Sequence, residues 1–129
     1  MNYKQIKKTY QEQKSVFCPI LQERVNFNSK GLRHLFYKNT TRKRVESEVV
    51  LRANYIKISR EIIGIRTTLQ ELDEINGSKM YGFISIINLD NKDSRIKIKV
   101  IIKKDGSGDW HFFSVIPKFS TSPKRDFKI

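Results

Sequence analysis

The chain has 129 residues, with 26 Lys and Arg against 13 Asp and Glu, a formal net charge of +13 and a pI of about 10.0. This length is sufficient for one domain with a buried core, and the hydrophobic content of 38% excludes a disordered basic tail. The excess of positive charge predicts a polyanionic partner, either a nucleic acid or an anionic membrane.

The single cysteine, Cys18, excludes an internal disulfide and a cysteine-based zinc site. Its apolar surroundings, VFCPIL, predict a small buried side chain. The sequence holds no apolar run long enough to cross a bilayer, and its polar N-terminus lacks a secretory signal. We therefore expect no membrane partner and a cytoplasmic location. An effector protein delivered by a route other than secretion through such a signal would have the same sequence features.

The first half of the chain has mainly helical periodicity. Residues 3–14 form a polar segment that permits a helix, and residues 24–27 alternate like a short strand. Ser29 is an N-cap candidate for a helix of about ten residues. A long helix is predicted over residues 45–63 and ends at Gly64. Its apolar positions recur at helical spacing: Val45, Val49, Ala53, Ile56 and Ile63.

The second half changes to runs rich in β-branched and aromatic residues. We expect three strands at residues 81–89, 95–102 and 110–117, joined by the polar segments DNKD and KKDGSGD. The middle strand alternates between an apolar face and a mostly cationic face. The apolar face holds Ile96, Ile98, Val100 and Ile102, and the other face holds Arg95, Lys97, Lys99 and Ile101.

This order predicts an α+β fold in which N-terminal helices pack on a C-terminal antiparallel β-meander sheet. We expect a single domain over residues 1–129, with its core at about 20–118. Residues 1–17 would form an N-terminal helical arm, and residues 119–129 a flexible tail.

His34 lies on the polar side of the predicted helix that follows Ser29. At 100° per residue, Leu32 and Leu35 share the apolar face, and His34 falls on the opposite side. It is therefore either an ordinary surface histidine or one that faces a cationic cleft, and helix geometry alone favours the first. Neighbouring cations would lower its pKa and keep the imidazole neutral, as a general base requires.

The loop after this helix, residues 38–44, carries four cations in seven residues. Charge runs are usually solvated loops. Guanidinium groups and threonine hydroxyls also suit a phosphate clamp, and the net charge of the chain makes the two interpretations equally plausible.

The last predicted strand has two aromatic faces. Regular alternation places Trp110 and Ser114 on one face and His111 on the other. The sequence does not select which face lies inward. Regular alternation also keeps Ser114 and His111 out of a common site unless a β-bulge intervenes.

The sequence lacks a convergent set of carboxylates that would hold a divalent metal. The acidic segment TLQELDEI, with Glu71, Asp73 and Glu74, is interpreted as a solvated turn or helix end. We therefore expect no metal site and no cofactor, and a nuclease with this sequence would work without metal.

The predicted elements follow in the order of a helix reading G-L-x-H-L, a basic connector, a long helix and a meander ending in H-F-F-S-V-I-P. This order resembles the barnase–EndoU–colicin–RelE (BECR) nuclease superfamily. The resemblance covers roughly residues 20–118 and is greatest to the small phage-type and bacterial toxin-like members. It implies a metal-independent endoribonuclease, in which the 2′-OH attacks the adjacent phosphate and leaves a 2′,3′-cyclic phosphate. By position, the helix histidine is His34 and the strand residue is Ser114.

In this interpretation His34 is the general base, while Lys99 and Arg42 hold the phosphate oxygens as negative charge develops. His111 is a candidate acid for the 5′-oxygen, and Ser114 ranks ahead of it because it matches the family position. Trp110 or Tyr37 would stack on an unpaired base. The expected nucleic-acid contacts are Arg33, Lys38, Arg42, Lys43, Arg44, Lys97 and Trp110.

The expected partner is RNA as substrate, with an acidic antitoxin or immunity protein as a second candidate. The main alternative is a noncatalytic module of the same fold that binds nucleic acid. It would show salt-dependent binding and leave its substrate intact. A scaffold protein whose charge only keeps it soluble is a third, weaker alternative.

Overall fold

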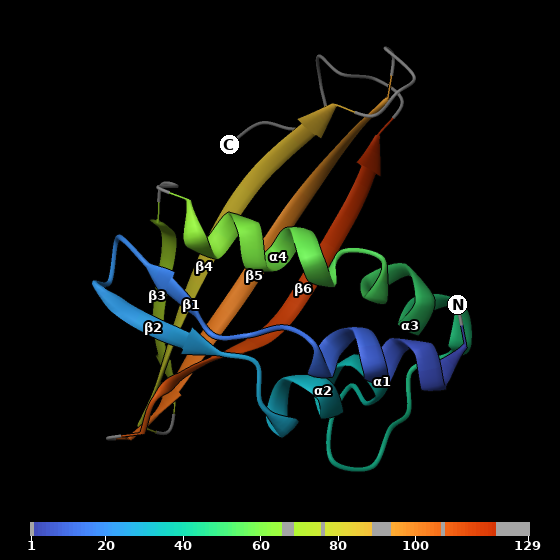
Figure 1. Cartoon of the computed structure of the whole chain (residues 1–129), viewed down its shortest axis with the longest axis horizontal. Coiled ribbons are helices and arrows are strands. Elements are labelled where there is room, and N and C mark those ends of the chain that lie inside the picture. Colours follow the sequence, from blue (N-terminus) through green and yellow to red (C-terminus); the bar gives the residue numbers. More distant parts are fainter. Residues whose placement is uncertain (1, 66–68, 76, 89–93, 107, 121–129) are drawn as a thin grey trace.

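The computed structural model describes residues 2–65, 69–75, 77–88, 94–106 and 108–120, with the backbone alone for 69–75 and 119–120. These residues form an α+β fold of four helices and six strands (Figure 1). The helices are α1 (Tyr3–Gln11), α2 (Ser29–Phe36), α3 (Glu46–Ala53) and α4 (Ile56–Gly64). The strands are β1 (Val16–Cys18), β2 (Glu23–Asn26), β3 (Leu69–Ile75), β4 (Ser78–Asn88), β5 (Arg95–Asp105) and β6 (Trp110–Ser120).

The six strands form one sheet in the order β1-β2-β6-β5-β4-β3. Strands β3 to β6 pair antiparallel in chain order and form the expected meander. The short β1–β2 hairpin extends the sheet through the parallel pairing of β2 with β6. The predicted fold class is therefore confirmed, and the sheet is mixed because of this one parallel pair.

The core lies on the apolar face of β5. Ile96, Ile98, Val100 and Ile102 are fully buried, which confirms the alternation read from the sequence. Helix α4 crosses this face (Figure 1) and contacts β1, β4 and β5. Residues of one strand alternate between faces, so Lys97, Lys99 and Lys103 of β5 lie on the side away from α4.

Several elements differ from the predicted ones. The long helix is two helices, because the turn at Asn54 and Tyr55, both weak helix formers, ends α3 and starts α4. The N-cap of α2 is Asn28, whose side chain accepts a hydrogen bond from the Lys30 amide at 3.1 Å. The segment predicted as a solvated turn or helix end is the edge strand β3.

The two ends of the chain also depart from the expected organisation. Helix α1 belongs to the core rather than to an outlying arm, since Ile6 and Tyr10 are buried. Residues 119–120 continue β6 instead of starting a tail. Residues 121–129 and the predicted connection DNKD lie outside the described part of the chain.

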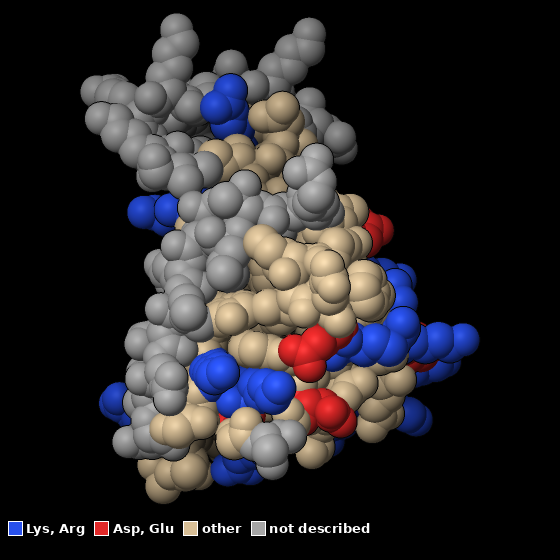
Figure 2. All heavy atoms as spheres, turned by 90° about the vertical axis from the view of Figure 1, so that its left-hand side faces the viewer, with Lys and Arg blue, Asp and Glu red and all other residues tan. Residues whose placement is uncertain are grey.

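Lys and Arg side chains lie at several places on the face of the molecule that Figure 2 shows. Viewed from the side of β1 and β3, Lys and Arg border a largely uncharged centre, with a few acidic side chains among them (Figure 2). The net charge of the chain is therefore not confined to the cleft described below.

Gly31 allows α2 to pack closely against β6. It is buried, and a Cβ atom added there would meet the Tyr10 hydroxyl and the carbonyl and ring of Phe112. The Tyr10 hydroxyl also donates a hydrogen bond to the Asn28 carbonyl at 2.7 Å. The start of α2 is thereby fixed against both α1 and the last strand.

We expect Gly31→Ala to destabilise the protein. In a helix interior Gly→Ala normally stabilises by about 0.5–1 kcal/mol, whereas overpacking of a tight contact costs about 1–3 kcal/mol. Urea unfolding should therefore show a lower free energy of unfolding, and Ser47→Ala on the exposed side of α3 should change it by less than about 0.5 kcal/mol. A more stable Gly31→Ala variant would contradict this packing.

Candidate functional site

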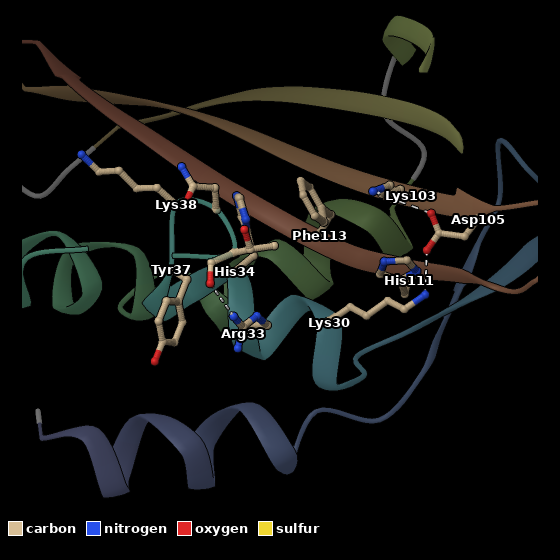
Figure 3. Close-up of a pocket in the computed structure, with 11 residues that line it drawn as sticks. Lys30, Arg33, His34, Tyr37, Lys38, Lys103, Asp105, His111 and Phe113 are labelled. Carbon is tan, nitrogen blue, oxygen red and sulfur yellow. Dashed lines mark hydrogen bonds and ion pairs between the residues drawn. The ribbon is translucent and has the colours of Figure 1, made fainter. Parts of the chain in front are cut away.

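A cleft of about 360 Å³ lies between α2, the following loop and the lysine-bearing face of β5 and β6 (Figure 3). Its size is within the range of small-molecule sites, about 300–1,000 Å³. It is lined by Lys30, Arg33, His34, Tyr37, Lys38, Asn39, Thr40, Lys103, Asp105, His111 and Phe113. Both histidines of the chain therefore line one cleft.

A β-bulge at Phe113 sets the faces of β6. Ile101 pairs with Ser114 and Ile102 pairs with Phe112, so Phe113 is an extra residue in the strand. His111 pairs with Lys103 and therefore shares a face with Ser114. The predicted regular alternation, with Ser114 on the face of Trp110, is wrong because of this bulge.

His34 is held by a ring contact and an arginine. Its ring stacks on Phe113 at 4.2 Å between centroids, and a guanidinium nitrogen of Arg44 lies 3.1 Å from its Nε2. Because a guanidinium group only donates hydrogen bonds, Nε2 accepts and the neutral ring carries its proton on Nδ1. Burial, followed by the charges of Arg44 and other nearby cations, lowers the pKa of His34 from 6.5 to about 4.

His111 is the more deeply buried histidine, at 2% exposure. Its Nε2 has no hydrogen-bond partner among the described residues, which is rare for a buried polar atom. Burial lowers the pKa of His111, while the carboxylate of Asp105 acts in the opposite direction. The ring therefore holds a buried nitrogen, Nε2, whose partner is unassigned.

Asp105 organises the cationic end of the cleft. It accepts hydrogen bonds from Lys30 Nζ at 2.7 Å and Ser78 Oγ at 2.8 Å, and Lys103 Nζ lies 3.7 Å away. The hydrogen bonds from Lys30 and Ser78 lower the pKa of this carboxyl from 3.8 to about 2. In Figure 3, Lys30 passes beside the His111 ring on its way to Asp105.

A second polar network connects the loop and α3 to β6. The Arg44 guanidinium donates to the His34 carbonyl at 3.0 Å and to Glu48 at 2.8 Å. Arg52, 3.5 Å from Glu48, donates to Ser114 Oγ at 2.9 Å. Ser114 is buried and does not line the cleft, so its hydroxyl holds Arg52 in place.

Two expected nucleic-acid contacts are corrected. Trp110 is 3% exposed, packs against Tyr81 and donates its indole N–H to Glu23 at 3.0 Å, so it cannot stack on a base. Arg44 is 8% exposed and occupied by His34 and Glu48, so it supports the cleft and does not act as an open phosphate clamp.

The remaining predicted residues divide by position. His34, Arg33, Lys38 and His111 line the cleft. Lys97 and Lys99 share a face with Lys103, but Lys99 is four residues away, about 13 Å along the strand. Neither of them lines the cleft, and neither does Arg42 or Lys43.

Sequence reasoning missed Lys30, Lys103, Asp105 and Phe113. The cationic face of β5 continues past the predicted end of the strand, so extending the alternation to Lys103 and Asp105 would have found two of them. Phe113 becomes identifiable only once the bulge is known.

The described residues contain no group of three His, Cys, Asp or Glu side chains that could hold a metal ion. None of the described helices has the length and apolar character needed to span a membrane. Comparisons with protein-family models, curated proteins and solved structures found no match. The resemblance to BECR nucleases therefore stays a hypothesis based on the residues quoted above.

We expect the His34 resonances to titrate with a midpoint near pH 4 and to show the Nδ1–H tautomer above it. Because folding lowers this pKa, only the unfolded state takes up the proton between about pH 6.5 and pH 4. The free energy of unfolding should therefore fall as the pH falls through that window, by at most about 3.5 kcal/mol at 1.4 kcal/mol per unit of pKa shift. Nitrogen-detected NMR gives the midpoint and tautomer directly.

The matched variant is His34→Gln, whose amide oxygen can still accept from Arg44. Urea unfolding between pH 7 and pH 4 should show a weaker pH dependence for this variant than for the wild type. A His34 midpoint above pH 6 would contradict the buried, arginine-bonded ring.

Proposed function

We propose that the protein is a metal-independent endoribonuclease that acts in the cleft between α2 and β6. The supporting observation is the convergence of His34, His111 and Lys103 on one cleft of about 360 Å³. Two imidazoles and an ammonium group are suitable groups for phosphodiester cleavage, which needs a proton acceptor, a proton donor and positive charge near the phosphate.

The charges around the cleft favour a phosphate ligand. Lys30, Arg33, Lys38 and Lys103 line it, and Asp105 is the one acid among its lining residues in the described chain. That carboxylate is already bound by Lys30 and Ser78, so repulsion of an incoming anion is partly neutralised. Lys30 is exposed, and ion pairs of this kind contribute little, about 0–1 kcal/mol, so it can turn toward a phosphate at small cost.

The hydrogen bonds suggest roles for the two histidines that differ from those expected from the sequence. His34 Nε2 accepts from Arg44, so its lone pair is occupied and Nδ1–H is a donor for a phosphate oxygen. His111 Nε2 has no described partner, so we assign the 2′-OH proton to it. Attack forms the bond from O2′ to phosphorus and breaks the bond to O5′, and Lys103 supplies positive charge and a proton to the leaving oxygen.

The alternative is a module that binds RNA without cleaving it. The burial of His111 favours this alternative, because its Nε2 reaches a ligand only if the neighbouring side chains move. Binding without cleavage would still be salt-dependent, because cations in the cleft displace counterions from the nucleic acid. An acidic antitoxin stays a prediction from the resemblance alone.

We expect the wild-type protein to cleave single-stranded RNA in EDTA and to leave 2′,3′-cyclic phosphate ends. His111→Gln should reduce the rate by about 10²–10⁴-fold, because it removes the proton acceptor. Lys103→Gln should reduce it by about 10²–10³-fold, as loss of a charge-stabilising donor does. End mapping and single-turnover rates on a defined oligonucleotide measure both effects.

Lys99→Gln is the matched control for Lys103→Gln, since both lysines lie on one face of β5 and only Lys103 lines the cleft. It should change the rate by less than about tenfold, as expected for a contact outside the reacting groups. A larger loss of rate in Lys99→Gln would indicate that Lys99, the residue predicted from the sequence, stabilises the charge on the phosphate. If the RNA stays intact and its binding weakens as the salt concentration rises, the proposal of a nuclease is rejected in favour of a module that binds RNA.

A further inference from the structure

A second cavity of about 360 Å³ lies between α1, α2 and the loop at residues 37–44. Helix α1 contributes Tyr3 and Lys7, both exposed, to one wall. The other residues that line it are Ser29, Leu32, Arg33, Phe36, Tyr37, Lys43 and Arg44. Of the residues that line or support the first cleft, Arg33, Tyr37 and Arg44 also line this cavity.

The cavity combines aromatic rings with positive charge. Tyr3 meets Phe36 edge to face at 5.0 Å between centroids and stays 45% exposed. Lys7 Nζ lies 5.9 Å from the Phe36 ring, and Lys43 Nζ lies 5.9 Å from the Tyr37 ring. Its described lining holds four cations and no carboxylate. A ligand that fits both features is flat and carries negative charge, as a nucleotide does.

The second cavity adjoins the cleft. Arg33 and Tyr37 line both, and the Arg33 guanidinium stacks on the Tyr37 ring at 4.5 Å. Figure 3 shows both side chains on the α1 side of α2, away from the strand that carries His111 and Phe113. The Arg33–Tyr37 pair is therefore a wall between the two cavities.

We propose that the second cavity is a subsite for an unpaired nucleobase and its phosphate, next to the nucleotide held in the cleft. The proposal rests on the proposed function for its choice of RNA as the strand that spans both sites. The base would stack on Tyr3 or Tyr37, and Lys7 and Lys43 would face its phosphate. The substrate class is accordingly single-stranded RNA, since a base inside a duplex is not free to enter the cavity.

Binding of short 2′-O-methyl oligoribonucleotides, which lack the attacking hydroxyl, tests the subsite without cleavage. Fluorescence anisotropy compares a tetranucleotide with two versions in which the 5′ or the 3′ terminal base is replaced by an abasic residue. Tyr3→Leu should weaken binding of the intact tetranucleotide by about 5- to 150-fold, the range measured for loss of one base-stacking ring. With one of the two abasic versions, Tyr3→Leu should have no effect.

Lys7→Gln should weaken binding more than Lys4→Gln, the matched loss of one charge on the same helix outside the cavity. Urea unfolding checks that the Tyr3→Leu variant is folded. If that variant is not folded, the comparison of Lys7→Gln with Lys4→Gln still tests the subsite. Equal effects of Tyr3→Leu on all three oligonucleotides would overturn the subsite, and so would failure of the wild type to bind the intact one. Base-dependent binding without cleavage of unmodified RNA would instead keep the subsite and reject the nuclease.

Discussion

The structure of the cleft depends on the close contact of α2 with β6 at Gly31. Only a residue without a side chain allows the helix to approach Phe112 this closely, and the Tyr10 hydroxyl fills the remaining space. From this contact α2 projects Lys30 and His34 toward the sheet, one residue before and three after the glycine. A helix displaced by the width of a methyl group would move both side chains away from His111 and Lys103.

Positive charge predominates among the ionisable side chains around the cleft. Burial has the largest effect in lowering the pKa of His34, and the charges of Arg44, Arg52 and Lys103 lower it further. Glu48 compensates Arg44 and Arg52, and Asp105 compensates Lys30 and Lys103, so each acid is shared between two cations. The remaining positive potential is uncompensated within the cleft, and an incoming polyanion would relieve it. Repulsion among these cations would decrease when an anion binds, so it favours an anionic ligand in the cleft.

The sequence predicted much of the fold and only part of the site. The helix–sheet order and the apolar face of β5 followed from periodicity, because burial enforces the pattern. The end of α4 at Gly64 followed from the preference for glycine at helix C-termini. The short strand β3 was missed because its segment contains three acids, which oppose a strand assignment by propensity. The burial of Trp110 and Arg44 was also missed, since it depends on hydrogen-bond partners that the sequence does not identify. Trp110 is bound to Glu23, which is distant in the sequence, and Arg44 is bound to Glu48 in the next helix.

The bulge and the arginine network together explain why the site could not be read from spacing alone. One extra residue in β6 places His111 on the face of Ser114, a result that no regular alternation allows. Arg44 then joins the two cavities, since its guanidinium group contacts His34 of the cleft and Arg44 is also a lining residue of the second cavity. A single buried side chain thus supports the walls of both, and the hydrogen bond that fixes the tautomer of His34 also fixes the position of the loop. The two cavities are therefore linked through Arg44, because a movement of its guanidinium group would change the contact with His34 that supports the cleft.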